Sequence, residues 1–253
     1  MNNLLSQTVY LIKRDYQNQN RTFLLSYMWI GLSPLLGLSV IVILKSRGVL
    51  NLPSIDAPFM YFLIFNYANW RFLRMLISIP AASVRDASTS VFSMRLSVHA
   101  IALSKIHFGF QDFVIRMLPL IPVGLYFNFY SDFLSLNYCV GLISLVILGI
   151  GIGSLIAPLL IFFNDFSKLW GSFFPAMIFL SPVFYPIPSG NGILARVVQL
   201  NPLSQPLALM QKSMFETVDI YGIYFFSLLF FSTISIYCLV RMCHKNLTVV
   251  NQI

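Results

Sequence analysis

Charge is scarce in this chain of 253 residues, of which 9% are charged and 58% are hydrophobic. A soluble domain typically carries about a quarter charged residues, so the shortage excludes an ordinary globular protein and predicts an all-α polytopic membrane protein. Residues 1–22 are polar or amphipathic and are not followed by a small-residue cleavage site. We therefore expect the first apolar run to remain in the mature protein.

Residues that carry catalytic or metal chemistry are also few. Cys139, Cys238 and Cys243 stand singly, with no C-x-x-C pair and no histidine at ligand spacing, so we expect neither a disulfide nor a metal site. The three histidines have no converging acids, and no paired carboxylates occur at helical spacing. We expect no catalytic residue, which disfavours a membrane-embedded acyl or glycosyl transferase.

Nucleotide-binding motifs are absent as well. No G-x-x-x-x-G-K-[ST] occurs, so the chain lacks the phosphate cradle of a P-loop. If it uses ATP, both ATP and Mg²⁺ bind to another chain. Gly149, Gly151 and Gly153 lie inside an apolar run and favour close helix packing over nucleotide binding. The net charge of +8 does not indicate nucleic acid, because the basic residues flank apolar segments as membrane topology requires.

Apolar runs of about 20 residues, the length a bilayer core needs, predict six transmembrane helices. They cover residues 23–44, 58–80, 107–129, 137–163, 169–185 and 220–240. Asp112 stands four residues before Arg116 in the third span, a spacing that lets the pair meet on one helical face.

Three segments outside the spans have characters of their own. Residues 1–22 place Leu5, Val9, Ile12 and Tyr16 at helical spacing, which predicts a cytoplasmic amphipathic helix at the membrane interface, with a frayed tail as the alternative. The polar stretch 81–106 predicts a cytoplasmic coupling loop with a short helix of its own, with a solvated connector as the alternative. The Pro, Gly and polar residues of 186–219 predict a re-entrant periplasmic region between spans five and six.

Basic residues indicate the orientation of the spans. With the N-terminus inside, nine of the 16 basic residues lie on the cytoplasmic side, four lie outside and three are embedded. The inside set is Lys13, Arg14, Arg21, Arg85, Arg95, Lys105, Lys168, Arg241 and Lys245, and the outside set is Lys45, Arg47, Arg196 and Lys212. The positive-inside rule therefore predicts that both termini are cytoplasmic.

Short motifs follow this pattern in order along the chain. They are Arg14-Asp15, Leu25-Ser26-Tyr27-Met28-Trp29 with Pro34, Trp70, Asp112-Phe113, Phe163-Asn164-Asp165, LSPVFYP at 180–186 and NPL at 201–203. Together they resemble the permease subunits of type-2 ABC exporters, and are most similar to those that export capsule, O-antigen or teichoic-acid polymers. Ser26 stands where the family's R-D … L-G-x-x-W-x-x-x-x-P motif has glycine, and Asn69 stands where the family has a proline before Trp70.

The resemblance implies one transmembrane domain over residues 1–253, paired as a homodimer in the bacterial inner membrane and joined by two copies of an ABC ATPase subunit. The implied cargo is a lipid-linked or nascent polysaccharide, with periplasmic and outer-membrane export proteins as possible further partners. A permease of the same family that exports a drug or a small lipid is the alternative, as is a passive channel. An ATPase gene among glycosyltransferase genes would favour polymer export.

Two sets of residues are candidates for function. The substrate-pathway candidates are Arg71, Arg74, Trp70, Tyr67, Phe184 and Tyr185, because guanidinium groups bind anions and flat aromatic faces suit sugar rings. The ATPase-coupling candidates are Asp86, Arg85, Arg95, Arg14, Asp15 and Asp165. The alternatives for the first set are that its aromatic residues form interfacial belts or pack in the core, and that its arginines pair with acids such as Asp112.

Overall fold

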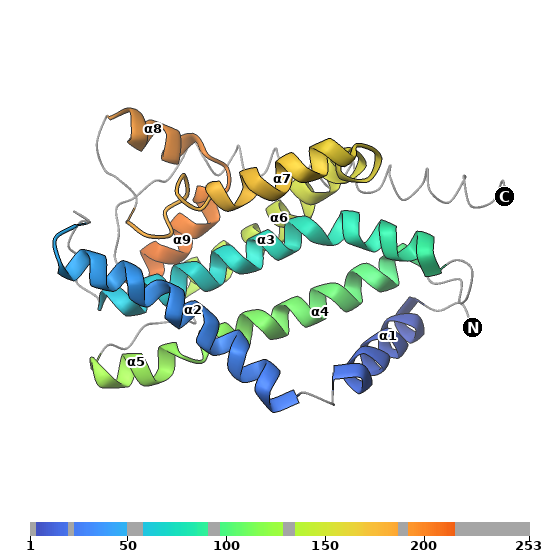
Figure 1. The fold of residues 1–253 in the computed structure, drawn as a ribbon, viewed down its shortest axis with the longest axis horizontal. Helices are drawn as coiled ribbons and strands as arrows, with labels where there is room; N and C mark the ends of the chain where they lie inside the picture. The colour runs from blue at the N-terminus through green and yellow to red at the C-terminus, as the bar shows by residue number, and fades with distance from the viewer. Residues whose placement is uncertain are drawn as a thin grey trace.

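The computed structural model describes residues 4–19, 23–49, 58–90, 97–128, 135–186 and 192–215. Every regular element within these ranges is an α-helix, which confirms the all-α prediction (Figure 1). The helices are α1 (Leu4–Gln19), α2 (Phe23–Ser46), α3 (Phe59–Ser90), α4 (Val98–Met117), α5 (Leu120–Tyr126), α6 (Leu136–Phe162), α7 (Asn164–Ala176), α8 (Ile193–Leu200) and α9 (Ser204–Phe215). The expected sixth span, over 220–240, lies outside the described residues.

Three stretches of the described chain are long and apolar enough to cross a membrane. They are Tyr27–Ser46, Val98–Tyr126 and Leu136–Phe162, with mean hydropathy of 2.0, 1.3 and 2.6. The third stretch is 27 residues long, or about 40 Å at 1.5 Å per residue, which exceeds the roughly 30 Å of a bilayer core. These lengths and compositions indicate a membrane protein.

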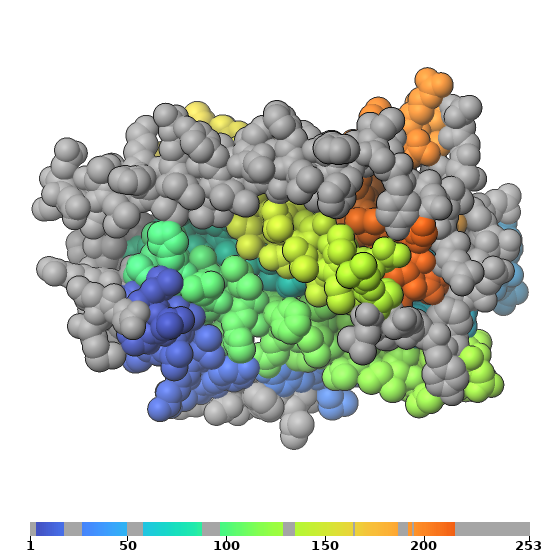
Figure 2. Space-filling view, turned by 180° about the vertical axis from the view of Figure 1, so that it is seen from behind, coloured from blue at the N-terminus to red at the C-terminus, as the bar shows by residue number. Residues whose placement is uncertain are grey.

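Helix α3 lies at the centre of the bundle, between α4 and α6 (Figure 1). Phe62, Leu63, Phe65, Leu73 and Leu76 of α3 are fully buried. Helix α9 packs against α6, and Figure 2 shows the two side by side on the rear face. The short α1 packs on α4 at the end of the bundle where α3 and α6 finish.

The glycine residues of α6 bring it close to α3. A Cβ on Gly153 would lie 2.3 Å from the backbone oxygen of Ile77, and one on Gly149 would lie 2.7 Å from the Cβ of Leu76. Neither distance is compatible with a real side chain, so only glycine fits at these crossings. This confirms the prediction that the glycine cluster serves close helix packing.

The stretch 81–106 differs from the expected loop with its own short helix. Helix α3 continues to Ser90, and α4 already begins at Val98 with the Ser97 hydroxyl accepting the N–H of Ala100 at 3.2 Å. No glycine or proline interrupts residues 81–106, and nothing therefore forces the helices to stop at the edge of the apolar run. With 32 residues, α3 is about 48 Å long and extends beyond a bilayer core.

The fifth expected span, over 169–185, also differs. Helix α7 begins at Asn164 and ends at Ala176, so its 13 residues reach only about 20 Å. Residues 177–185 form turns with i to i+3 hydrogen bonds, such as Leu180 N–H to the Met177 oxygen at 3.1 Å. Pro175, in the last turn of α7, and Pro182, within the turns, both lack a backbone N–H, and the missing donors disfavour a continuous helix over 169–185.

Candidate functional site

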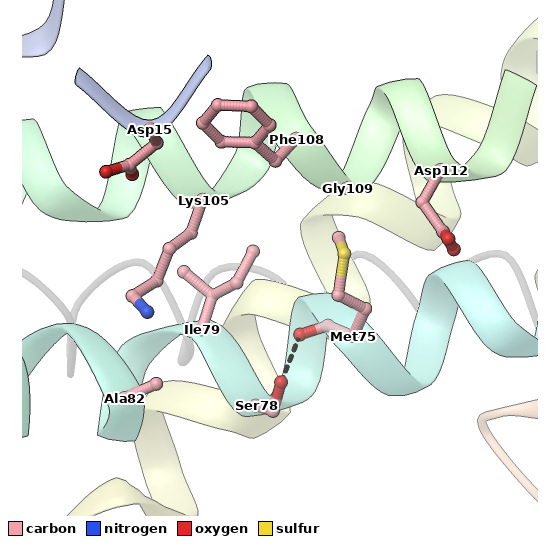
Figure 3. Close-up of a pocket in the computed structure, with 9 residues that line it drawn as sticks. All are labelled: Asp15, Met75, Ser78, Ile79, Ala82, Lys105, Phe108, Gly109 and Asp112. Atoms are coloured by element: carbon pink, nitrogen blue, oxygen red, sulfur yellow. Dashed lines mark hydrogen bonds between the residues drawn. The ribbon is translucent and has the colours of Figure 1, made fainter. Parts of the chain in front are cut away.

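A pocket of about 520 Å³ opens between α1, α3 and α4 (Figure 3). Its lining residues are Asp15 of α1, Met75, Ser78, Ile79 and Ala82 of α3, and Lys105, Phe108, Gly109 and Asp112 of α4. The wall is apolar where Met75, Ile79 and Phe108 meet, and it carries charge at Asp15, Lys105 and Asp112. This combination of an apolar wall and a charged rim suits an amphipathic partner better than a small ion.

Gly109 allows the two long helices to approach at the pocket. A Cβ on Gly109 would lie 1.7 Å from Cε of Met75, the flexible end of that side chain, so a larger residue at 109 would require Met75 to move. Met75 and Gly109 both line the pocket in Figure 3. The shape of the pocket therefore depends on this crossing of α3 and α4.

The charges around the pocket are paired. Lys105 contacts the Asp86 carboxylate at 2.8 Å, and Arg14 contacts the Asp15 carboxylate at 2.9 Å. Both pairs are largely open to solvent, where an ion pair contributes little stability. They leave the pocket region close to neutral, and it offers no concentrated positive charge to an anion.

The third pair lies within α4 and consists of buried Arg116 and half-buried Asp112, and its arginine also contacts α2. Arg116 donates two hydrogen bonds to the Asp112 carboxylate, from Nε at 2.8 Å and from Nη2 at 3.1 Å. This confirms the prediction that the i, i+4 pair meets on one helical face. The Nη1 atom of Arg116 also donates to the backbone oxygen of Ile30 at 3.2 Å. Residue 34 is proline, and proline has no N–H to satisfy the oxygen four residues earlier. Arg116 therefore supplies the donor that Pro34 removes from α2.

A chain of side-chain hydrogen bonds links α1, α4 and α2 beside this pair. The Tyr16 hydroxyl donates to Gln111 Oε1 at 2.7 Å, and Gln111 Nε2 donates to the Tyr27 hydroxyl at 2.5 Å. Leu11 is 3% exposed in a small cluster with Ala87 and Ala100. Through these contacts α1 is attached to the bundle rather than lying free of it.

A polar stripe runs along α3, the central helix of the bundle. Between residues 59 and 79, Arg71, Arg74 and Ser78 are exposed, and every other residue is buried or half-buried. Tyr67 is half-buried one turn before Arg71. Residues spaced by three and four share one helical face, and we call Tyr67, Arg71, Arg74 and Ser78 the α3 stripe.

The two arginines of the α3 stripe have no partner within the described part of the chain. Asp112, the acid named above as an alternative partner for these arginines, is paired with Arg116. The second expected span, over 58–80, lies in α3, which is not among the three stretches apolar enough to cross a membrane. In a helix that does cross, an arginine at the centre costs about 2.5–3.5 kcal/mol for insertion, or roughly 5–7 kcal/mol for Arg71 and Arg74 together. Charges that carry such a cost usually face a bundle interior or a water-filled cavity.

The aromatic pathway candidates lie elsewhere. Trp70 is 3% exposed and stacks on Phe174 of α7, with ring centroids 5.3 Å apart. Phe184 packs against Phe179 at 5.5 Å, and the Tyr185 hydroxyl donates to the Phe179 oxygen at 2.8 Å. The structure therefore separates buried Trp70 from the exposed arginines beside it in sequence, and places Phe184 and Tyr185 in the turns after α7.

The coupling candidates gather where α3 and α6 end. Arg85 donates from Nη2 to the backbone oxygen of Leu160 in the last turn of α6, where a helix leaves its carbonyls unpaired and favours a cation. Asp165 lies just beyond, in the first turn of α7, and is 3.5 Å from Lys168. Arg95 lies outside the described residues.

One polar cluster was missed by the sequence reasoning. Gln211 of α9 is fully buried and donates to the Asn66 side chain of α3 at 2.8 Å and to the backbone oxygen of Pro182. Asn201 donates to the Leu180 oxygen at 3.1 Å and to the Ser181 hydroxyl at 3.3 Å. The LSPVFYP and NPL motifs are therefore hydrogen-bonded to each other. In the sequence, the cluster was marked only by Asn66, a polar residue within the apolar run of α3.

The fold and this site define a helical membrane protein with a charged stripe on its central helix. No model of a known protein family matches the chain, and no curated protein matches it. Among the described residues, no group of three or more His, Cys, Asp or Glu side chains could hold a metal ion.

Proposed function

We propose that this chain is the permease subunit of an ATP-driven exporter that moves a lipid-linked or nascent polysaccharide across the bacterial inner membrane. The observation that carries the proposal is the α3 stripe. Two arginines without a partner among the described residues are exposed halfway along the central helix of a membrane protein. Such an arrangement is disfavoured unless the stripe faces water or cargo.

Further support comes from the resemblance of the motifs to type-2 ABC permeases and from the contacts of those motifs. Asn201 of the NPL segment donates to Leu180 and Ser181 of the LSPVFYP segment, 21 and 20 residues earlier in the chain. Arg85 and Asp86 of α3 contact α6 and α4 at the end of the bundle that also carries α1. A partner that binds this end could therefore move several helices together.

The topology that completes the proposal has six spans, an interfacial N-terminal helix and both termini in the cytoplasm. In this topology α8 and α9 belong to a re-entrant periplasmic region. Because the chain has no P-loop motif, ATP and Mg²⁺ bind to a separate ATPase subunit, with two copies serving a homodimer of this chain.

Affinity purification in a mild detergent tests the coupling. We expect a P-loop ATPase to co-purify with the full-length chain at a ratio of one to one. Replacing residues 86–95 by a Gly/Ser linker should abolish this association while membrane insertion continues. The control changes Arg47 and Arg196 to glutamine, because both are exposed on the expected outer side. Purification without any ATPase, or undiminished association of the linker variant, would contradict the proposal.

A further inference from the structure

We infer that Arg71 and Arg74 form an anion-binding site for the phosphate group of a lipid-linked cargo. The inference rests on the proposed function, since it assigns the cargo chemistry recognised by the α3 stripe. It differs from a general aqueous path because it names the two residues and the group that they bind.

The position of the arginines is the first step. Arg71 and Arg74 follow Phe59, the first residue of α3, by 12 and 15 residues, which places them about 18 and 22 Å along the helix. A bilayer core is about 30 Å thick. In the proposed topology, in which α3 is the second span, both arginines lie near the middle of the membrane, and an anion that meets them there must travel with the cargo.

The second step is the contrast with the other arginines of the bundle. Arg116 is satisfied by Asp112 and the Ile30 oxygen, and Arg85 donates to the Leu160 oxygen. Within the described residues, Arg71 and Arg74 have neither a carboxylate nor a carbonyl partner. No described side chain or carbonyl oxygen competes with a ligand for their donors.

The third step is the chemistry of the pair. Side chains three residues apart on a helix are neighbours, so both guanidinium forks can reach one phosphate. Guanidinium forks bind phosphate through paired hydrogen bonds, which a lysine ammonium cannot reproduce. The pocket beside Ser78 is a poorer place for the anion, because the carboxylates of Asp15 and Asp112 line it.

The test measures binding of geranylgeranyl phosphate and geranylgeraniol to the purified full-length protein in dodecyl maltoside. The two probes share a hydrocarbon chain and differ in the phosphate. We expect the wild type to prefer the phosphate by about tenfold or more, because two charge-assisted contacts are at stake. Inorganic phosphate and an oligouronate, in separate arms, show whether the lipid chain is needed and whether a carboxylate can replace phosphate.

Three variants decide the assignment. Arg71→Gln with Arg74→Gln should reduce the preference to within about twofold, while Arg71→Lys with Arg74→Lys should retain part of it. The matched control, Arg47→Gln with Arg196→Gln, removes the same charge from exposed outer positions and should keep the full preference. The thermal midpoint of the Arg71/Arg74 glutamine variant should be unchanged or higher, because no described contact is lost.

Four outcomes would overturn the inference, and a fifth concerns the exporter proposal alone. Equal binding of geranylgeranyl phosphate and geranylgeraniol by the wild type would show that the protein has no phosphate site. An unchanged preference for the phosphate in the Arg71/Arg74 glutamine variant would show that the site lies elsewhere. A stronger response to the oligouronate reassigns the arginines to the polymer. A large fall in thermal midpoint for both the glutamine and the lysine variant makes them structural. If the wild type prefers the phosphate but no ATPase co-purifies with it, the exporter proposal is contradicted and the anion site is not.

Discussion

Arg116 shows how a single side chain supports a broken helix. In α2, Pro34 leaves the Ile30 oxygen without its usual N–H donor. The Nη1 atom of Arg116, on α4, donates to this oxygen at 3.2 Å instead. Prolines are tolerated in membrane helices when neighbouring groups satisfy the backbone in this way. The local pair of Arg116 with Asp112 was predictable from an i, i+4 spacing, whereas the bond to Ile30 depends on how α2 crosses α4 and left no sign in the sequence.

A double-mutant cycle tests this role. Arg116→Met should lower the free energy of unfolding by about 1.5–3 kcal/mol, because it removes hydrogen bonds made by a charged donor. Pro34→Ala restores an N–H to α2, so the same arginine change in that background should cost about 1 kcal/mol less. The loss of the Asp112 contact is common to both backgrounds and cancels. Additivity within about 0.5 kcal/mol would show that Pro34 and Arg116 are independent.

The elements predicted best were those whose limits are set by strong local signals. The span expected at 137–163 is α6 (Leu136–Phe162), where a long apolar run follows the N-cap Ser135. The expected start of the first span coincides with α2. At 81–106 and 169–185 the apolar run and the helix do not coincide, because polar residues can continue a helix and prolines can end one within apolar sequence. Hydropathy measures affinity for lipid, and it does not locate helix ends.

The contact between α3 and α6 gives a prediction at the scale of elements. Gly153→Ala places a Cβ 2.3 Å from the Ile77 backbone, so the helices must separate and the variant should lose about 1–3 kcal/mol of stability. Gly31→Ala is the matched control, since nothing lies within 4 Å of its added Cβ. Thermal unfolding followed by size-exclusion chromatography in detergent measures both. Equal thermal midpoints for the two variants would show that the close crossing is not required.

At the scale of the whole molecule, the proposed topology with both termini in the cytoplasm gives a labelling prediction. In a background with Cys139→Ser, Cys238→Ser and Cys243→Ser, Gly192→Cys should react with an impermeant maleimide in intact cells, and Lys13→Cys should react only after permeabilisation. Both positions are exposed in the structure, so accessibility depends on the side of the membrane. Labelling of Lys13→Cys in intact cells would reverse the orientation derived from the positive-inside rule.

The cargo could be inferred only by resemblance, because no residue pattern encodes a polymer. The spacing of the two arginines was visible in the sequence, and the structure adds their exposure on a stretch, 59–79, that is otherwise mostly buried. That exposure depends on how α3 packs against α2, α4, α5, α6 and α9, and a single sequence does not reveal it. The buried position of Trp70 against Phe174 has the same origin.

The most direct measurement of the central claim compares surface and internal polysaccharide in cells that lack this chain. Polymer is extracted first from intact cells and then from lysed spheroplasts, with the wild-type chain and the Arg71→Gln, Arg74→Gln variant restored in parallel strains. The account predicts that polymer disappears from the surface and accumulates inside, that the wild-type chain restores it, and that the variant restores it poorly at normal protein level. Unchanged surface polymer in cells that lack the chain would contradict polysaccharide export. If an ATPase nevertheless co-purifies with the wild-type chain, that result would favour export of a drug or small lipid.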